Sequence, residues 1–218
     1  MLSVVIPSLD AAATLSGCLD ALGPVPDLIV VDGGSRDTTR EIAAAAGARV
    51  IDAPRGRGLQ LAVGADAATQ PWLLFLHADT RLSRGWRAAV KAHAAARPGT
   101  AGAFRFRLDD AAWQARLVEK GVALRVNLLA LPYGDQGLLI SRGLYQELGG
   151  YRPLPLMEDV DLVGRIGRRR MAVLPADAIT SAERWRRDGW ARRSGRNLAC
   201  LALHRLGMSA EKVARLYG

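Results

Sequence analysis

Four short apolar segments alternate with helical segments in the first half of this chain, and that alternation restricts the possible folds more than any other feature. The apolar segments are residues 2–6, 28–31, 48–51 and 72–76. Stretches of about ten residues that are rich in Ala and Leu separate them, with the spacing of amphipathic helices. Strands that alternate with such helices indicate a parallel sheet covered on both faces. The sequence therefore predicts an α/β fold with a mostly parallel, doubly wound sheet.

Polar residues or glycines follow each of these four strands. They occupy residues 8–10, 32–37, 55–58 and 77–80. The carboxyl ends of parallel strands lie at one edge of a sheet, where open α/β sheets bind their ligands. We therefore expect the four loops to converge on a single ligand.

The fourth loop contains two potential metal ligands. His77 and Asp79 are two positions apart, and side chains at that spacing along a strand project to the same side. The sequence thus predicts a metal site at the rim of the sheet. In the structural alternative, Asp79 caps the segment that starts near Ser83 and His77 only forms hydrogen bonds.

Two common phosphate-binding motifs are absent from the sequence. It contains no GxxxxGK[ST] segment, and its first strand-to-helix turn has no GxGxxG. Gly56 and Gly58 follow the third strand, but Leu61 stands where a third glycine would be needed. A dinucleotide-binding enzyme and a P-loop protein are therefore disfavoured.

The second half of the chain begins with a strand and a long helix. Alternation of small or apolar with basic residues predicts a strand at residues 101–108, and helical spacing predicts a helix at residues 110–131. The further expected elements are strands at residues 138–141, 172–174 and 178–181, a helix from Glu158, and helices at 198–206 and after Ser209.

Three acidic residues lie within four positions at the start of one of these helices. Glu158, Asp159 and Asp161 precede apolar residues at helical spacing, and the helix dipole favours charged carboxylates in a first turn. A carboxylate that is kept ionised can act as a general base beside a reacting hydroxyl. The alternative is an ordinary acidic helix start.

The formal net charge of +9 is concentrated at the C-terminus. Residues 180–218 contain eight Arg and one Lys against three acidic residues, so they carry six of the nine net positive charges. A basic tail predicts an anionic partner such as nucleic acid, an anionic membrane surface or a phosphorylated small molecule. Nucleic acid is disfavoured because the basic residues are confined to the tail and form no recognisable reading motif.

The cysteines and the N-terminus predict a cytoplasmic location. Cys18 and Cys200 have no metal-ligand or disulfide-framework spacing. The chain starts directly with an apolar strand, without a basic leader, and no apolar run approaches the roughly 20 residues of a membrane span. We expect a cytoplasmic protein whose basic tail is free to contact the inner face of a membrane.

An ordered set of motifs resembles the family 2 glycosyltransferases of GT-A fold, a Rossmann-like α/β fold. The motifs are SVVIPSLDAAATL, IVVDGGSRDTT, GRGLQLAVGADAA, LLFLHADT, GLLISRGLYQELGGYRP and EDVDLVGRI. FLHADT, YGDQG and SAERW look most like the arsenosugar-biosynthesis subgroup of that family. The resemblance implies a glycosyltransferase domain at residues 1–182, with a nucleotide-binding half (1–100) and an acceptor half (101–182). Residues 183–218 would form a basic helical extension.

The resemblance also implies a binding site for a nucleoside-diphosphate sugar. The residues expected there are Pro7, Ser8 and Asp10 at the base, Asp32 at the base or ribose, Arg57 near the nucleotide, and Asp79 on a divalent cation. His77 stands where the family usually has another carboxylate, and imidazole suits Mn²⁺ better than Mg²⁺. Leu9 replaces an aromatic residue that often stacks on the base, so the choice between uracil and guanine stays open.

The implied reaction is transfer of the sugar to an acceptor hydroxyl with inversion at the anomeric carbon. Asp159 matches the general base of the family and Glu158 its neighbour. Arg184 and Trp185 would lie beside the diphosphate and the acceptor, and we expect Asp135 to bind the acceptor. The alternatives are a sugar-phosphate nucleotidyltransferase, whose Gly- and Arg-rich first loop is absent, and a non-catalytic module that binds a nucleotide sugar or a membrane surface.

Overall fold

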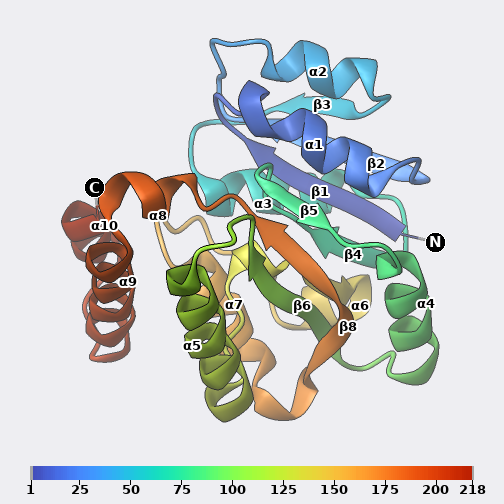
Figure 1. Cartoon of the computed structure of the whole chain (residues 1–218). Coiled ribbons are helices and arrows are strands. Elements are labelled where there is room, and N and C mark those ends of the chain that lie inside the picture. Colours follow the sequence, from blue (N-terminus) through green and yellow to red (C-terminus); the bar gives the residue numbers. More distant parts are fainter. Residues whose placement is uncertain (1, 218) are drawn as a thin grey trace.

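The computed structural model describes residues 2–217 and contains one curved sheet with helices packed against it (Figure 1). Within these residues the sheet has eight strands. They are β1 (Leu2–Ser8), β2 (Asp27–Asp32), β3 (Arg49–Asp52), β4 (Trp72–Phe75), β5 (Thr80–Leu82), β6 (Ala101–Leu108), β7 (Leu138–Ser141) and β8 (Met171–Thr180).

The strand order is β3-β2-β1-β4-β7-β6-β8-β5. The four strands predicted in the first half pair in parallel with one another, and β6 is parallel to β8. Strand β7 is antiparallel to both β4 and β6, and β5 is antiparallel to β8. The predicted α/β fold with a mostly parallel sheet is therefore confirmed, and the four expected loops do leave the sheet at one edge.

Helices lie on both faces of the sheet and beyond its edge. The α-helices are α1 (Ala12–Leu22), α2 (Thr39–Ala45), α3 (Arg57–Ala67), α4 (Trp86–Ala96), α5 (Trp113–Leu129), α6 (Arg142–Glu147), α7 (Glu158–Ile166), α8 (Glu183–Asp188), α9 (Trp190–Arg205) and α10 (Ala210–Tyr217). Two short 3₁₀ helices, η1 (Gly134–Gln136) and η2 (Arg168–Arg170), complete the described elements.

Alternation along the central strands divides the core between the two faces. In β1, Val4 and Ile6 pack with buried residues of α1, α2 and α4, whereas Val5 packs with those of α3, α6 and α7. Successive side chains of a strand point to opposite faces, so one apolar strand supplies both cores. This two-sided burial explains why the strands are continuous apolar runs.

The predicted pair of strands at 172–174 and 178–181 is wrong, because the structure has the single strand β8. Pro175 lies between the two predicted segments. In the structure its position coincides with a shift in pairing, where Phe104 pairs with Leu174 but Arg105 pairs with Asp177. A bulge absorbs the extra residues, and a bulge is one of the few places where a strand tolerates proline.

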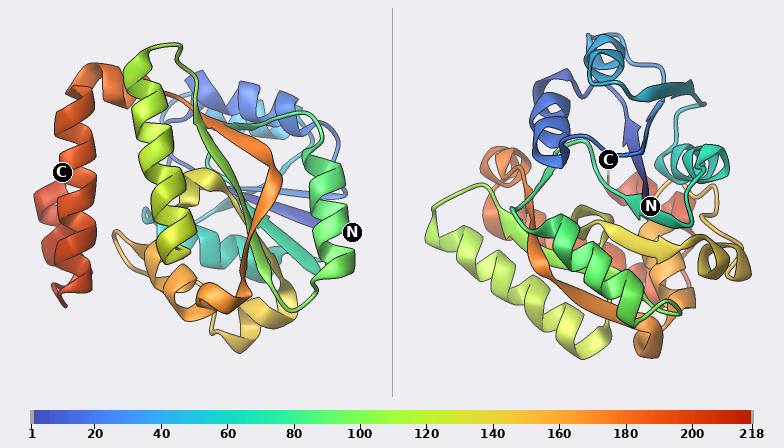
Figure 2. Two further views of the ribbon diagram at one scale, coloured as in Figure 1. Left: turned by 60° about the horizontal axis from the view of Figure 1, so that its bottom comes forward. Right: turned by 90° about the vertical axis from the view of Figure 1, so that its right-hand side faces the viewer.

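The C-terminal extension forms three helices, α8 to α10, and the last two pack beside α7. Cys200 and Leu201 of α9 and Val213 of α10 join a buried cluster with Met157 and Val160 around α7. Figure 2 shows α9 running beside α5 at one side of the molecule. Helix α9 begins eight residues before the predicted helix at 198–206. No helix within residues 2–217 is long and apolar enough to span a membrane.

Candidate active site

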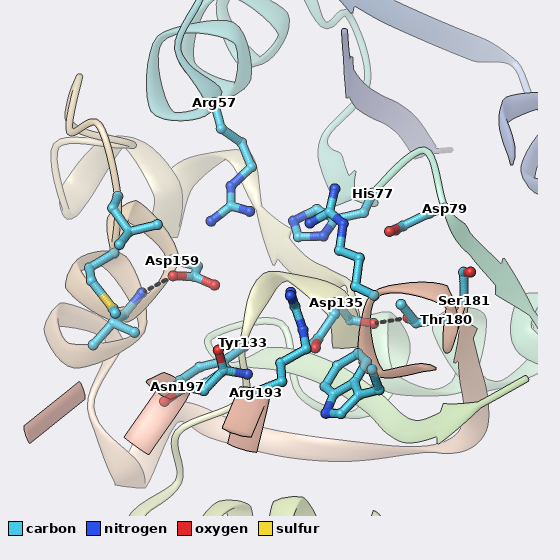
Figure 3. Close-up of a pocket in the computed structure, with 15 residues that line it drawn as sticks. Arg57, His77, Asp79, Tyr133, Asp135, Asp159, Thr180, Ser181, Arg193 and Asn197 are labelled. Atoms are coloured by element: carbon cyan, nitrogen blue, oxygen red, sulfur yellow. Dashed lines mark hydrogen bonds between the residues drawn. The ribbon is translucent and has the colours of Figure 1, made fainter. Parts of the chain in front are cut away.

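Two adjoining pockets open at the carboxyl edge of the parallel strands. One has a volume of about 470 Å³ and lies beside the end of β1, and we name it the β1 pocket. The other has a volume of about 120 Å³ and lies beside the N-terminus of α7, and we name it the α7 pocket (Figure 3). The residues that line both pockets are Arg57, His77, Asp79, Ser181 and Arg184. The two pockets therefore meet beside the loop that follows β4.

The wall of the β1 pocket includes Pro7, Ser8 and Asp10, which the sequence assigned to nucleotide binding. Asp10 has a left-handed backbone with φ of 47°. Its Oδ1 accepts a hydrogen bond of 2.8 Å from the backbone N–H of Arg36, which joins the loop after β1 to the loop after β2. The loops after β1, β3 and β4 line the pocket directly, whereas the loop after β2 supports it from behind.

Asp32 is the last residue of β2, next to that supporting loop, and it lines neither pocket, since its side chain is fully buried. The backbone N–H groups of Gly34 and Ser35 donate to its Oδ2 over 3.0 and 2.9 Å. Burial opposes ionisation of the carboxyl, but the hydrogen bonds from Ser35 and Gly34 hold its pKa below the usual value. The structure therefore places Asp32 as an ionised residue that shapes the loop.

His77 and Asp79 line both pockets, although strand alternation does not set their orientation. Strand β4 ends at Phe75, and a turn closed by the hydrogen bond from Thr80 N–H to His77 O carries both residues. Burial, reinforced by the charge of Arg57, lowers the pKa of His77 to about 4, so its imidazole is neutral at physiological pH. A neutral imidazole is the form that binds metal ions.

The ligand set at this junction suits a cation that shares its coordination with a bound ligand. Within residues 2–217, no three His, Cys, Asp or Glu side chains cluster closely enough to hold a metal alone. His77 and Asp79 would supply two donors. Divalent cations that assist phosphate chemistry commonly take the remaining oxygens from the phosphates and water.

Asp159 lies in the first turn of α7 and lines only the α7 pocket. Its carboxylate accepts two backbone hydrogen bonds, from Gly134 to Oδ2 over 2.7 Å and from Val160 to Oδ1 over 2.8 Å. The residue is 8% exposed, and Figure 3 shows its carboxylate directed into the pocket. Met157, just before the helix, has the left-handed φ of 64°, a strained conformation that is concentrated at functional sites.

Glu158 lines neither pocket and pairs with Arg57. Arg57 Nε donates to Glu158 Oε1, and the Glu158 side chain is fully buried. Desolvation raises the pKa of Glu158, although the charge of Arg57 opposes the effect. The structure thus places Glu158 as the anchor of Arg57, which itself reaches both pockets.

Asp135 lines the α7 pocket from η1. Burial, with the neighbouring Asp159 and Asp79 carboxylates adding to the effect, raises its pKa to about 6, while Arg125 and Arg57 oppose the rise. Its Oδ1 is buried and has no hydrogen-bond partner among the described residues. A buried carboxyl oxygen without a partner is a candidate contact for a bound ligand.

The C-terminal extension contributes four side chains to the same pocket: Arg184 and Trp185 from α8, and Arg193 and Asn197 from α9. The Arg193 guanidinium lies 5.0 Å from the centre of the Trp185 ring. The sequence predicts Arg184 and Trp185 at this site but gives no signal for Asn197. Arg193 and Asn197 are four residues apart on α9 and therefore lie on the same face of the helix, the face that lines the α7 pocket.

Comparison with known proteins identifies the family. The model of the family described as "Glycosyl transferase family 2" matches residues 3–142. This chain belongs to glycosyl transferase family 2. The match covers β1 to β7, and hence most of the β1 pocket, whereas Asp159 and the extension lie beyond it.

Among curated relatives, a PGL/p-HBAD biosynthesis glycosyltransferase of Mycobacterium tuberculosis is 41% identical over 93 residues. That alignment covers 38% of this family 2 chain and 36% of the relative, so this chain matches little more than a third of the relative's length.

Two solved structures show the same fold at low sequence identity. Glucosyl-3-phosphoglycerate synthase of M. tuberculosis, in complex with Mn²⁺, UDP and glucosyl-3-phosphoglycerate, has a TM-score of 0.58 at 23% identity, covering 83% of this chain and 70% of that one. S. aureus TarS 1–349 in complex with UDP-GlcNAc has a TM-score of 0.64 at 14% identity, covering 82% and 58%. Both confirm the GT-A fold expected for a family 2 glycosyltransferase.

Proposed function

We propose that this glycosyltransferase moves a sugar, with inversion, from a nucleoside-diphosphate sugar to an acceptor hydroxyl. One observation carries the proposal: the two pockets meet beside His77 and Asp79, and Asp159 lines only the α7 pocket. A leaving group in the β1 pocket and an attacking hydroxyl in the α7 pocket would lie on opposite sides of the same anomeric carbon. That arrangement is the one required for a single in-line displacement.

The donor nucleotide would occupy the β1 pocket. Its volume of about 470 Å³ lies within the range of about 300 to 1000 Å³ that is common for ligand pockets. Pro7, Ser8 and Asp10 would contact the nucleoside, with Asp32 holding the adjoining loop in shape. Arg57 and Arg184 lie where the pockets meet and would contact the diphosphate. The solved neighbours named above support this assignment, because they were crystallised with UDP or UDP-GlcNAc.

His77 and Asp79 would hold a divalent cation on the diphosphate. When bound, such a cation neutralises the charge that develops on the leaving nucleoside diphosphate. The neutral imidazole and the carboxylate fit Mn²⁺ or Mg²⁺, and the M. tuberculosis neighbour was crystallised with each of these ions.

Asp159 would take the proton from the acceptor hydroxyl. Its two backbone hydrogen bonds, from Gly134 and Val160, fix the carboxylate at the pocket wall. Asp135 and Trp185 would bind the acceptor, and Arg193 would add to the basic wall of the pocket.

The resemblance to the arsenosugar-biosynthesis subgroup and a membrane contact of the basic tail remain predictions.

Calorimetric titration with UDP and with GDP, each with and without Mn²⁺, tests the donor site. We expect metal-dependent binding of one of the two nucleotides. Incubation with the matching nucleotide sugars and an acceptor panel should then release nucleoside diphosphate and yield a product of inverted anomeric configuration. Nucleotide binding without any transfer would instead support the non-catalytic binding module, and absence of binding to either nucleotide would count against both.

A further inference from the structure

An apolar groove lies between α5 and α9 and adjoins the α7 pocket. Its cavity volume is about 310 Å³. Figures 1 and 2 both show α5 and α9 side by side. The apolar side chains that line the groove are Phe106, Leu117, Val118, Val122 and Leu198. The groove therefore has the size and the lining of a site for an apolar ligand.

The rim of the groove exposes apolar side chains to water. Leu117 on α5 is 56% exposed, and Leu198 on α9 is 63% exposed. Leu117 also continues an exposed apolar stripe on the solvent side of α5 that includes Trp113 and Leu124. Contiguous exposed apolar surface of this kind marks ligand grooves and interaction sites, because covering it with apolar atoms is favourable.

The groove and the α7 pocket share a boundary, which we name the throat, formed by Tyr133, Asp135, Trp185 and Asn197. These four residues line both cavities. A molecule lying in the groove would therefore reach the pocket that contains Asp159 without crossing the protein core.

Three polar atoms at the throat are buried without a hydrogen-bond partner among the described residues. They are Asp135 Oδ1, Trp185 Nε1 and Asn197 Oδ1. Arg125 lies beside them, with its guanidinium 3.5 Å from the centre of the Tyr133 ring. Buried polar atoms in folded proteins almost always have partners, so the throat is suited to a ligand group that both donates and accepts hydrogen bonds.

We propose that the acceptor is amphipathic, with a hydroxyl-bearing polar head in the throat and the α7 pocket and an apolar chain in the α5–α9 groove. This assignment rests on the proposed function, because it takes Asp159 as the base that receives the acceptor proton. A second copy of the chain or a membrane surface would cover the apolar rim but would leave the buried polar atoms of the throat without partners. The combination of an apolar groove and a polar throat therefore favours one amphipathic molecule.

Binding of n-alkyl β-D-glucosides tests the proposal. Methyl, hexyl and octyl glucoside, each kept below its micelle concentration, would be titrated calorimetrically into the full chain. Burial of each added methylene should raise affinity roughly threefold to fourfold, in line with about 0.8 kcal/mol per buried CH₂. The readout is binding, so it does not require that glucoside be the natural head group or that transfer occur.

Gly121 offers a variant that closes the groove without disturbing the core. It lines the groove on α5, and no atom lies within 4 Å of the position that its Cβ would take. Glycine weakens helices, so replacement should not impair folding. We expect Gly121→Trp to reduce octyl glucoside affinity at least tenfold and to leave methyl glucoside unchanged.

Two variants control for this substitution. Gly121→Ala gains the same helix propensity without filling the groove and should bind as the unmodified chain does. Gly143→Trp, on α6, adds the same side chain at another exposed helical glycine with open space around its Cβ. It should also retain the dependence on chain length.

Several outcomes would overturn the inference. These are affinity that does not depend on chain length, no binding of any alkyl glucoside, or octyl glucoside binding that Gly121→Trp leaves intact. A dimer in sedimentation that Gly121→Trp dissociates would assign the groove to a second copy. Vesicle binding lost in Gly121→Trp, without alkyl glucoside binding, would assign it to a membrane surface.

UDP and GDP titrations on the same preparations separate this inference from the proposed function. If the protein binds a nucleotide but its affinity for the glucosides does not depend on the length of their alkyl chain, the proposed function stands and the amphipathic acceptor is excluded. A preparation that binds neither nucleotide would overturn the donor site, and with it the acceptor role of the groove.

Discussion

The backbone N–H of Gly134 donates to Asp159 Oδ2 over 2.7 Å, and the same glycine leaves room for the His77 ring. A Cβ on Gly134 would lie 2.5 Å from His77 Nε2 and 3.3 Å from Asp159 Oδ2. One glycine, in η1, thus brings together the proposed base and a proposed metal ligand, although their positions in the chain are far apart.

Gly134→Ala should therefore displace His77 and weaken metal-dependent nucleotide binding at least tenfold. The methyl group cannot occupy the same space as the imidazole at 2.5 Å, and the ring must move away from its position beside Asp79. Calorimetry with and without Mn²⁺ measures the effect. The double variant Gly134→Ala/His77→Ala should regain thermal stability but not metal dependence. Unchanged Mn²⁺-dependent affinity in Gly134→Ala would show that His77 does not act as a ligand.

Asp159→Asn should fold, bind the donor nucleotide and lose transfer by roughly 10² to 10⁴, the usual contribution of a general base. The amide cannot accept the acceptor proton, while the rest of the β1 pocket is unchanged. Asp161→Asn is the matched control, because Asp161 lies in the same helical turn but pairs with Arg152 and Arg165 and lines neither pocket. If Asp159→Asn turned over at the rate of that control, the role of base would pass to another residue.

Asp79→Ala should abolish the effect of Mn²⁺ on nucleotide affinity while leaving metal-free affinity nearly unchanged. The carboxylate is the stronger of the two proposed protein ligands, since His77 contributes a neutral donor. Titration of UDP and GDP into this variant, with the unmodified chain measured in parallel, checks the expectation. A metal effect of equal size in both proteins would place the cation elsewhere.

Asp135 should make the protein less stable as pH rises from about 4 to about 6. Its pKa in the folded chain is raised from 3.8 to about 6, mainly by burial, so in this window the folded state keeps a proton that the unfolded state has released. The contribution of the protonated Asp135 carboxyl to the stability of the fold is thus complete below pH 3.8 and is lost as pH rises through about 6. Asp135→Asn stays neutral and should gain in melting temperature relative to the unmodified chain at pH 7.5, but not at pH 4. An equal difference at the two pH values would contradict this account.

Arg57→Met should destabilise the fold by about 2 kcal/mol, because it leaves the Glu158 carboxylate buried without its cation. Removing one partner of a fully buried pair costs about 3 to 5 kcal/mol, and the partial exposure of Arg57 reduces that figure. Urea denaturation measures the change. The double variant Arg57→Met/Glu158→Met should recover most of the loss, and failure to recover would mean that the destabilisation arises from contacts other than the ion pair.

The candidate site was predicted best where the residues follow directly from strand ends. Ser8, Asp10 and Asp79 could be placed at this edge from the alternation of strands and helices, because parallel strands bring their carboxyl ends to one edge, whereas Pro7 was expected only from the family resemblance. The sequence pattern did not separate residues that line a pocket from residues that support one. Asp32 stands at an equivalent strand end, that of β2, but its side chain is fully buried.

Periodicity and motif order alone determined the α/β fold, the family and the segments that carry the proposed chemistry, because strand alternation, helical spacing and loop composition are local properties of a chain. The tertiary structure decided which of those residues meet. Arg57 and Glu158 are 101 positions apart, and Gly134 and Asp159 are 25 apart. Asn197 reaches the pocket only because α9 packs beside α5 and α7. Such contacts depend on how helices pack on the sheet, and no local pattern of residues records that packing.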